Sequence, residues 1–289
     1  MNCHDEGHCN HNMVHGSIGG PMRALVKSFV PAPARRWVRK AFGWRWLRGD
    51  YACWADARAA SDGYDAPYVL ARVRYATRAV RVGRATWERD GVLFSGSPEP
   101  TPLRAPLQRI AATEGGRLDV VDLGGGLGSS WWQQRDWFRE LVSVRWRVVE
   151  QAAWVEVGRR EFSGDGLEFY ATLAAACADD RPAVLLLSSV LPYVEKPRQL
   201  MAEAIRRRFS HIIIDRTGFT GRGRDWLTVQ HVPAAVGAAS YPCWLFDRDS
   251  LLEPLGLDYA LAGEWTLDEL DGRHDYRGFY FRRRSDAGR

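Results

Sequence analysis

A glycine-rich turn after a short apolar segment constrains the fold of this 289-residue chain more than any other feature. Residues 118–128 read Leu-Asp-Val-Val-Asp-Leu-Gly-Gly-Gly-Leu-Gly, with alternating glycines at 124, 126 and 128. Glycine lets a ligand approach bare backbone, and a helix that follows such a turn offers unpaired N–H groups to an electronegative group. We therefore expect a strand, a tight turn and a helix here, with a ligand at the turn.

The spacing of the glycines distinguishes two kinds of nucleoside cofactor. The pattern Asp-x-Gly-x-Gly-x-Gly, which starts at Asp122, is the turn expected of a protein that binds S-adenosylmethionine. The dinucleotide fingerprint needs Gly-x-Gly-x-x-Gly, and Ser129 stands where its third glycine would fall. No lysine or arginine lies near the turn to pair with a pyrophosphate. The pattern favours S-adenosylmethionine, and a tight turn without a ligand is the alternative.

A second segment carries an acidic residue at the expected place. Residues 145–151, Arg-Trp-Arg-Val-Val-Glu-Gln, read as a strand that ends at Glu150, 26 positions after Gly124. In nucleoside-binding βαβ units, an acidic residue about 20 positions past the glycines accepts the ribose hydroxyls. We predict this role for Glu150, with Gln151 contacting the adenine. A solvated acid at a strand end is the alternative for Glu150.

The composition excludes several classes of protein. Hydrophobic residues make up 46% of the chain, which excludes wholesale disorder. The net charge of +5 comes from arginines that are spread along the chain and mixed with acids. We interpret them as a base-composition bias of the source genome and expect no nucleic-acid partner. The five cysteines are scattered and odd in number, which favours a reducing cytoplasm over a disulfide framework.

The N-terminal residues differ from the rest of the chain. Residues 1–21 are rich in cysteine and histidine, but their spacing fits no closed zinc site, so a disordered tail or a start-site artefact is expected. Residues 34–48 combine basic residues with tryptophans. We favour an ordinary helix packed on the catalytic domain, and a peripheral contact with the inner membrane is the alternative. No apolar run reaches the ~20 residues that a membrane span needs.

The remaining residues divide into an extension and a sheet domain. Residues 22–106 are expected to form an N-terminal helical extension and linker, and residues 107–289 the cofactor-binding domain. Apolar residues repeat at helical spacing over 69–80, and Gly83 is a stop signal. This helix is expected to serve as a lid or as an oligomer surface, which leaves a homodimer open. The proline-rich stretch 95–106 is expected to be the linker.

Strands and helices alternate from residue 118 onward. This rhythm predicts a doubly wound, Rossmann-like α/β fold with a mostly parallel sheet and a C-terminal antiparallel hairpin, which is the class I methyltransferase version of that fold. The expected strands are 118–123, 145–150, 167–170, 183–189 and 211–215, the expected helices lie near 130–141, 152–161, 171–178 and 196–208, and the hairpin comprises 257–265 and 277–283.

The chain resembles a family of bacterial class I S-adenosylmethionine-dependent methyltransferases that are associated with surface-polysaccharide biosynthesis. The resemblance extends from about residue 44 to residue 283 and implies methyl transfer more strongly than any particular substrate. The matching segments are Tyr51–Trp54, Trp87–Phe94, Asp122–Gly128, Val148–Gln151, Ser188–Tyr193, Asp215–Thr217, Thr228–Gln230 and Ser240–Trp244.

In doubly wound sheets, ligands bind in the crevice at the carboxyl ends of the strands. We expect the cofactor to rest on the glycine turn, with the ribose on Glu150. Of Ser188 and Ser189, at least one is expected to cap the following turn and the other to line the methionine arm. The predicted cofactor-binding residues are Asp122, Gly124, Gly125, Gly126, Gly128, Glu150, Gln151, Ser188 and Ser189.

If the acceptor is a hydroxyl, a general base within hydrogen-bond reach should help the transfer. Asp215, at the end of an apolar strand, and His231, in an expected loop, are the two candidates. The alternatives are a salt bridge from Asp215 to Arg216 or a neighbouring loop, and a structural role for His231. No metal site is predicted, because the sheet domain has no His-x-x-x-His or Cys-x-x-Cys pair.

Residues 217–246 form too long a segment for a plain connection, so a lid or binding loop is expected. Aromatic and arginine side chains in it suit a sugar ring with a phosphate or carboxylate. Filling of the core beneath the loop by Tyr241 and Trp244 is the alternative. The predicted acceptor contacts are Tyr193, Arg216, Gln230, Tyr241 and Trp244.

Together these features favour O-methylation of a sugar or polysaccharide precursor, a small-molecule or glycan acceptor. An NAD-dependent oxidoreductase and a non-catalytic scaffold with the methyltransferase fold are the alternatives.

Overall fold

The computed structural model describes residues 46–62, 67–95, 101–178, 182–232, 239–267 and 274–284. The predictions for residues 1–21 and for most of the basic segment 34–48 lie outside these ranges. At the end of that segment Leu47–Arg48 form a short strand, β1, so the helix expected there does not extend to residue 48.

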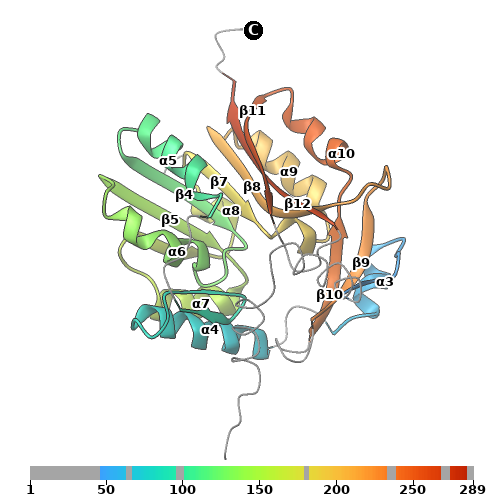
Figure 1. The fold of residues 1–289 in the computed structure, drawn as a ribbon, viewed down its shortest axis with the longest axis horizontal. Helices are drawn as coiled ribbons and strands as arrows, with labels where there is room; N and C mark the ends of the chain where they lie inside the picture. The colour runs from blue at the N-terminus through green and yellow to red at the C-terminus, as the bar shows by residue number, and fades with distance from the viewer. Residues whose placement is uncertain are drawn as a thin grey trace, which may run out of the picture.

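A seven-stranded sheet forms the centre of the molecule (Figure 1). Its strand order is β11-β12-β8-β7-β4-β5-β6, with the order reversing between β4 and β7. The neighbours from β8 to β6 pair in parallel, and β12 pairs antiparallel with both β8 and β11. The predicted doubly wound sheet with a C-terminal hairpin is confirmed. The strands are β4 (Arg117–Leu123), β5 (Ser143–Val149), β6 (Leu167–Tyr170), β7 (Val184–Ser188), β8 (His211–Phe219), β11 (Tyr259–Leu267) and β12 (Asp275–Arg283).

Both faces of the sheet are buried, which explains the continuous apolar runs of its strands. Along β4, Val120 joins the core on one face and Val121 the core on the other. The helices that contribute to the first core are α4 (Pro67–Arg81), α5 (Arg104–Thr113), α6 (Ser129–Phe138) and α7 (Ala152–Glu161), and those that contribute to the second are α8 (Leu173–Ala176), α9 (Pro197–Arg206) and α10 (Arg248–Leu252).

The N-terminal extension contains the predicted helix and also a hairpin. Helix α4 ends two residues before Gly83, which has the left-handed φ of 75° expected at a stop. Strands β2 (Trp87–Arg89) and β3 (Val92–Phe94) then pair across Asp90 and Gly91, both with positive φ. This is the type I′ turn that an Asp-Gly pair favours.

The prediction of a loop over residues 217–246 is wrong. Strand β8 continues to Phe219, and β9 (Trp226–Val232) pairs with β10 (Ala239–Leu245) and with β1 in a separate three-stranded sheet. Leu227 and Val229, two residues apart on β9, pack against helix α3 (Trp54–Ala59). Figure 1 shows this small sheet and α3 at the lower right of the molecule, with α4 at the lower left.

Within the part of the chain that the structure describes, none of the helices is long and apolar enough to cross a membrane.

Candidate active site

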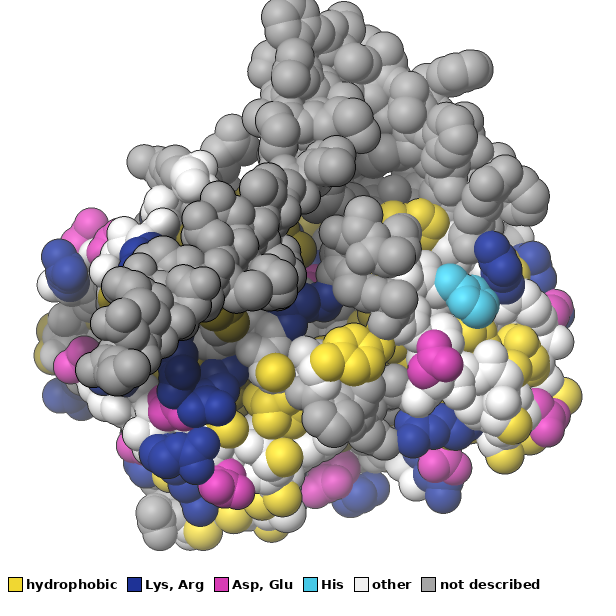
Figure 2. All heavy atoms as spheres, turned by 90° about the horizontal axis from the view of Figure 1, so that it is seen from below, with side chains coloured by type: hydrophobic (Ala, Val, Ile, Leu, Met, Phe, Trp, Pro, Cys, Tyr) yellow, Lys and Arg dark blue, Asp and Glu magenta, His cyan; other side chains and the backbone are white. Residues whose placement is uncertain are grey.

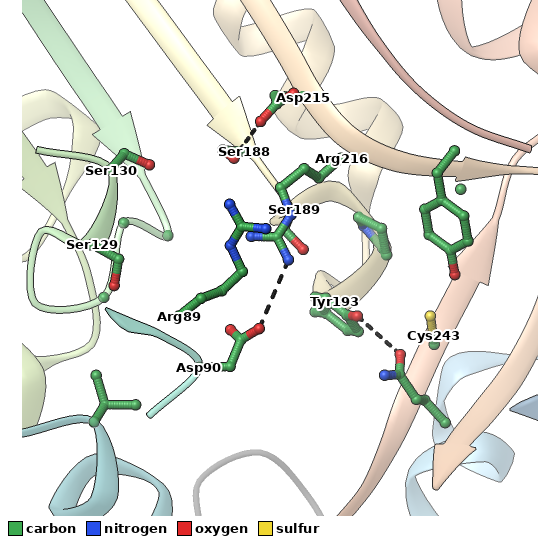
Figure 3. A pocket seen from close by; sticks show the side chains of 18 of the residues that line it. Arg89, Asp90, Ser129, Ser130, Ser188, Ser189, Tyr193, Asp215, Arg216 and Cys243 are labelled. Atoms are coloured by element: carbon green, nitrogen blue, oxygen red, sulfur yellow. Dashed lines mark hydrogen bonds and ion pairs between the residues drawn. The ribbon is translucent and has the colours of Figure 1, made fainter. Parts of the chain in front are cut away.

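A cavity of about 320 Å³ lies at the carboxyl ends of β4, β5, β7 and β8, where the strand order reverses (Figure 3). This is the place where doubly wound sheets bind ligands. Its further walls come from the β2–β3 hairpin, from α4 and from the small sheet. The predicted residues that line it are Asp122, Gly124, Gly125, Gly126, Glu150, Ser188, Ser189, Tyr193, Asp215, Arg216, Gln230, Tyr241 and Trp244.

Two positions of the glycine turn have no room for a side chain. A Cβ on Gly124 would lie 2.6 Å from Val190, and one on Gly125 would lie 2.6 Å from the Asp122 carboxyl group. Gly126, with φ of 61°, is different, because a Cβ there would meet only the Trp154 ring at 3.6 Å. The backbone at Gly126 is therefore open to a ligand.

Glu150 is fixed beside this open backbone. The Gly126 N–H donates to its Oε1 at 3.2 Å, and the Gln151 N–H donates to its Oε2 at 2.9 Å. Burial raises the pKa of this carboxyl group. A carboxylate oxygen can accept about two hydrogen bonds, so each oxygen retains acceptor capacity for a ligand. Gln151 itself is exposed at the start of α7 and does not line the cavity.

Asp122 lies fully buried under the turn. The Trp146 indole donates to Oδ2 at 3.0 Å, whereas Oδ1 has no hydrogen-bond partner among the described residues. Burial raises the pKa of Asp122 to about 7, against the effect of the Trp146 hydrogen bond, and the charges of Glu150 and Asp215 act in the same direction as burial. A buried acceptor without a donor is costly, which fits a site that receives a hydrogen-bond donor from a ligand.

This buried carboxyl group makes stability depend on pH. The ordinary pKa of aspartate is about 3.9, and that of folded Asp122 is about 7. Because the folded state holds this proton more tightly than the unfolded state does, protonation of Asp122 stabilises the fold. This stabilisation is complete below about pH 4 and is lost as the pH rises through about 7. Across this window the wild type should lose about 4 kcal/mol in the free energy of unfolding, and we expect Asp122→Asn to lack this loss.

Urea denaturation at both ends of the pH window measures this effect. The matched control is Asp136→Asn, because the Asp136 side chain on α6 is 72% exposed. An Asp122→Asn variant with the pH slope of the wild type would contradict the assignment.

A β-bulge places Asp215 and Arg216 in the cavity together. In the pairing of β8 with β12, Ile214 faces Phe279 and Thr217 faces Arg277. Asp215 and Arg216 therefore both stand opposite the single residue Gly278. Arg216 takes a left-handed φ of 51°, which occurs in one type of β-bulge. In a regular strand the two side chains would point to opposite faces. Here both line the cavity.

The Asp215 carboxyl group is held by two neutral donors. The Ser188 hydroxyl donates to Oδ2 at 3.0 Å and the Trp265 indole donates to Oδ1 at 3.0 Å. Arg216 forms an ion pair with Asp90 at 3.8 Å (Figure 3). Burial raises the pKa of Asp215, against the effect of the charge on Arg216. A carboxylate of raised pKa at a cavity wall can accept a proton from a ligand.

The opposite wall of the cavity is aromatic and amide-bearing. The Tyr193 hydroxyl donates to Gln230 Oε1 at 2.9 Å, and its ring meets Tyr241 edge-on at a centroid distance of 5.3 Å. Trp244 lines the cavity and also stacks on Trp54, with 6.3 Å between ring centroids. Tyr241 and Trp244, which were expected in a loop, thus line the cavity as parts of strand β10.

Three predicted residues do not line the cavity. His231 follows Gln230 on β9, and neighbouring strand residues point to opposite faces. The backbone N–H of His231 donates to Trp46 O at 2.6 Å, and burial lowers the pKa of its ring. Gly128 caps α6 and Gln151 caps α7. The structure therefore does not bring His231 together with Asp215.

Sequence reasoning missed the contribution of the β2–β3 hairpin. Glu88, Arg89 and Asp90 all line the cavity. The buried Glu88 carboxyl group accepts hydrogen bonds from the Ser129 hydroxyl and, at 3.1 Å, from the Gly91 N–H, and burial raises its pKa to about 7. The Asp-Gly pair was the available signal, because it favours a two-residue hairpin turn.

The strand order is that of the class I methyltransferase fold, with a crevice at its switch point. Figure 2 shows basic, acidic and hydrophobic side chains interspersed on the described part of the face seen from below. No protein-family model matches the sequence, and a search of curated proteins gives no match.

Solved structures with a similar arrangement include three that contain S-adenosylhomocysteine. The Burkholderia thailandensis 1,6-didemethyltoxoflavin-N1-methyltransferase is 18% identical, with a TM-score of 0.44 over 83% of this chain and 94% of that chain. The N-terminal domain of EvdMO1 with D-fucose is 17% identical, with a TM-score of 0.41 over 75% and 98%. The N-methyltransferase NodS from Bradyrhizobium japonicum WM9 is 13% identical, with a TM-score of 0.41 over 65% and 90%. Similarity at this level carries no functional argument, and the fold assignment rests on the strand order.

Proposed function

We propose that this protein is an S-adenosylmethionine-dependent methyltransferase that acts on a hydroxyl group of a sugar or a sugar-containing precursor. The observation that carries the proposal is the Glu150 carboxylate, which two backbone N–H groups hold at the tip of β5 beside the open backbone of Gly126. A fixed acceptor pair beside bare backbone suits the two hydroxyls and the flat faces of an adenosyl group.

The residues around the cavity would have separate roles in the reaction. Gly124–Gly126 and Glu150 would hold the cofactor, which supplies a methyl group activated by positive sulfur. Ser189 would line the methionine arm. Asp215 would accept the acceptor hydroxyl's proton, because Ser188 and Trp265 fix the carboxyl group at the cavity wall. Methyl transfer depends mainly on alignment, so a fixed cavity wall contributes directly to the rate.

A sugar acceptor is favoured by the wall opposite the glycine turn. Sugar-binding sites combine flat apolar rings with a few polar groups that fix orientation. Tyr193, Tyr241 and Trp244 supply rings here, and the Gln230 amide supplies the polar group. The wall therefore supports an acceptor ring with hydroxyl groups.

Binding of S-adenosylhomocysteine tests the proposal against an NAD-dependent oxidoreductase. Isothermal titration calorimetry should give an affinity in the micromolar range for S-adenosylhomocysteine and no displacement of it by NAD. Tight NAD binding that excludes S-adenosylhomocysteine would favour the oxidoreductase. Cofactor binding without transfer of labelled methyl to any acceptor in a panel of sugars, sugar phosphates and nucleotide sugars would favour a scaffold.

The role of Asp215 gives a separate prediction. Asp215→Asn keeps the size of the side chain but cannot take up the acceptor's proton, so we expect slower methyl transfer and unchanged affinity for S-adenosylhomocysteine. The transfer rate of the wild type should fall at acid pH, because Asp215 becomes protonated, and the variant should lack this dependence. Full activity of Asp215→Asn would remove Asp215 from the mechanism.

A further inference from the structure

Two arginine side chains enter the cavity from different parts of the fold. Arg89 comes from the β2–β3 hairpin of the extension, and Arg216 comes from the bulge of β8 (Figure 3). Burial raises the pKa of the Asp215 carboxyl group, and the guanidinium charges of Arg216 and Arg89 both oppose this effect. Both positive charges therefore lie near the place where the proposed base contacts the acceptor.

The carboxylate that faces Arg216 is held loosely. Asp90 lies 3.8 Å from the Arg216 guanidinium, whereas charge-assisted hydrogen bonds are typically about 2.7–2.9 Å long. The Asp90 side chain is 72% exposed, and that of Arg216 is 17% exposed. A partly buried guanidinium beside an exposed carboxylate at this distance can exchange that partner for the anionic group of a ligand.

Backbone strain is concentrated around the same two arginines. Among the described non-glycine residues with positive φ, three line the cavity: Asp90, Ser189 and Arg216, at 52°, 59° and 51°. Each such residue costs on the order of 1 kcal/mol, and positions of this kind cluster at ligand-binding sites. The three strained residues therefore lie in the part of the cavity where Arg89 and Arg216 come together.

We propose that the acceptor carries a carboxylate or phosphate group, which Arg89 and Arg216 bind while its ring lies against the wall of Tyr193 and Tyr241. This inference rests on the proposed function and specifies its substrate class. Arg216 is a predicted acceptor contact, and the arginines of residues 217–246 were expected to suit a phosphate or carboxylate. Arg222 and Arg224 of that segment instead form exposed ion pairs with Asp50 and do not line the cavity.

Calorimetry on protein saturated with S-adenosylhomocysteine tests the proposal. The probes are D-glucuronate, inorganic phosphate and uridine diphosphate, with D-glucose as the neutral comparison. We expect at least one anion to bind saturably and more tightly than D-glucose. Arg89→Gln and Arg216→Gln should each weaken that anion about 10-fold, the effect of losing a charge-assisted contact. Preference for glucuronate indicates a carboxylate-bearing acceptor, and preference for phosphate or uridine diphosphate a phosphorylated one.

Two controls separate this inference from the proposed function. Arg84→Gln removes an exposed arginine that precedes the hairpin and does not line the cavity, so it should not change anion affinity. S-adenosylhomocysteine should bind both cavity variants as it binds the wild type. If the wild type does not bind S-adenosylhomocysteine, the proposed function fails. If it does, absence of saturable anion binding, or equal anion affinity in both cavity variants and the wild type, overturns the anionic acceptor.

Discussion

Glu150→Ala is expected to weaken the binding of S-adenosylhomocysteine about 100-fold or more. The Glu150 carboxylate is the only acidic group that the described structure fixes by hydrogen bonds from both the glycine turn and the start of α7. Hydrogen bonds to a charged group are worth about 1.5–3 kcal/mol each, and about 1.4 kcal/mol corresponds to a factor of ten in affinity. Loss of two ribose contacts therefore corresponds to about two orders of magnitude at the lower end of that range and to more at its upper end.

Two further variants make the calorimetric experiment specific. Glu156→Ala removes an exposed acid of helix α7 that pairs with Arg160, and this variant should bind the ligand normally. Gly126→Arg puts a long side chain on the one glycine of the turn that is open to the cavity, and it should abolish binding. Wild-type affinity in both Glu150→Ala and Gly126→Arg would place the cofactor elsewhere.

Gly278→Ala is expected to lower the free energy of unfolding by about 3 kcal/mol, at the upper end of the usual cost of overpacking. A Cβ on Gly278 would lie 2.0 Å from the Trp265 ring, which crosses this residue in the pairing of β11 with β12. The ring cannot move without breaking its hydrogen bond to Asp215. The absence of a side chain at this position therefore allows both the sheet pairing and the placement of the proposed base.

The same hairpin provides a matched control. A Cβ on Gly263 would only touch Tyr280 at 3.7 Å, an ordinary contact, so Gly263→Ala should change the stability by less than about 1 kcal/mol. Trp265→Phe keeps a ring over Gly278 but removes the indole N–H. Expressed as free energies, its effect on the rate of methyl transfer should therefore exceed its effect on unfolding. Equal stability of Gly278→Ala and Gly263→Ala in urea denaturation would contradict the packing argument.

The central sheet could be predicted from the sequence because its signals are local. Strands buried on both faces give apolar runs such as 183–189, and a glycine turn marks the start of the next helix whatever surrounds it. The cofactor side of the cavity, from Asp122 to Glu150, follows from these signals. The predicted contacts lie within one βαβ unit, so no long-range pairing was needed to place them.

The five residues predicted to contact the acceptor all line the cavity, but the strands that place them there could not be predicted, because they depend on pairing between distant segments. Gln230 reaches the cavity only because β9 pairs with both β1 and β10. Arg216 reaches it only because one residue of β12, Gly278, stands opposite two residues of β8. Nothing in the local pattern of Asp215-Arg216 indicates a bulge. The β2–β3 hairpin is the exception, since Asp90-Gly91 is a local signal for it.

A crystal structure of the complex with S-adenosylhomocysteine tests the central claim most directly. Our account predicts both ribose hydroxyls within hydrogen-bond distance of the Glu150 carboxylate, with the ligand passing over Gly126. A complex with the ligand outside this cavity, or with the ribose away from Glu150, would contradict it.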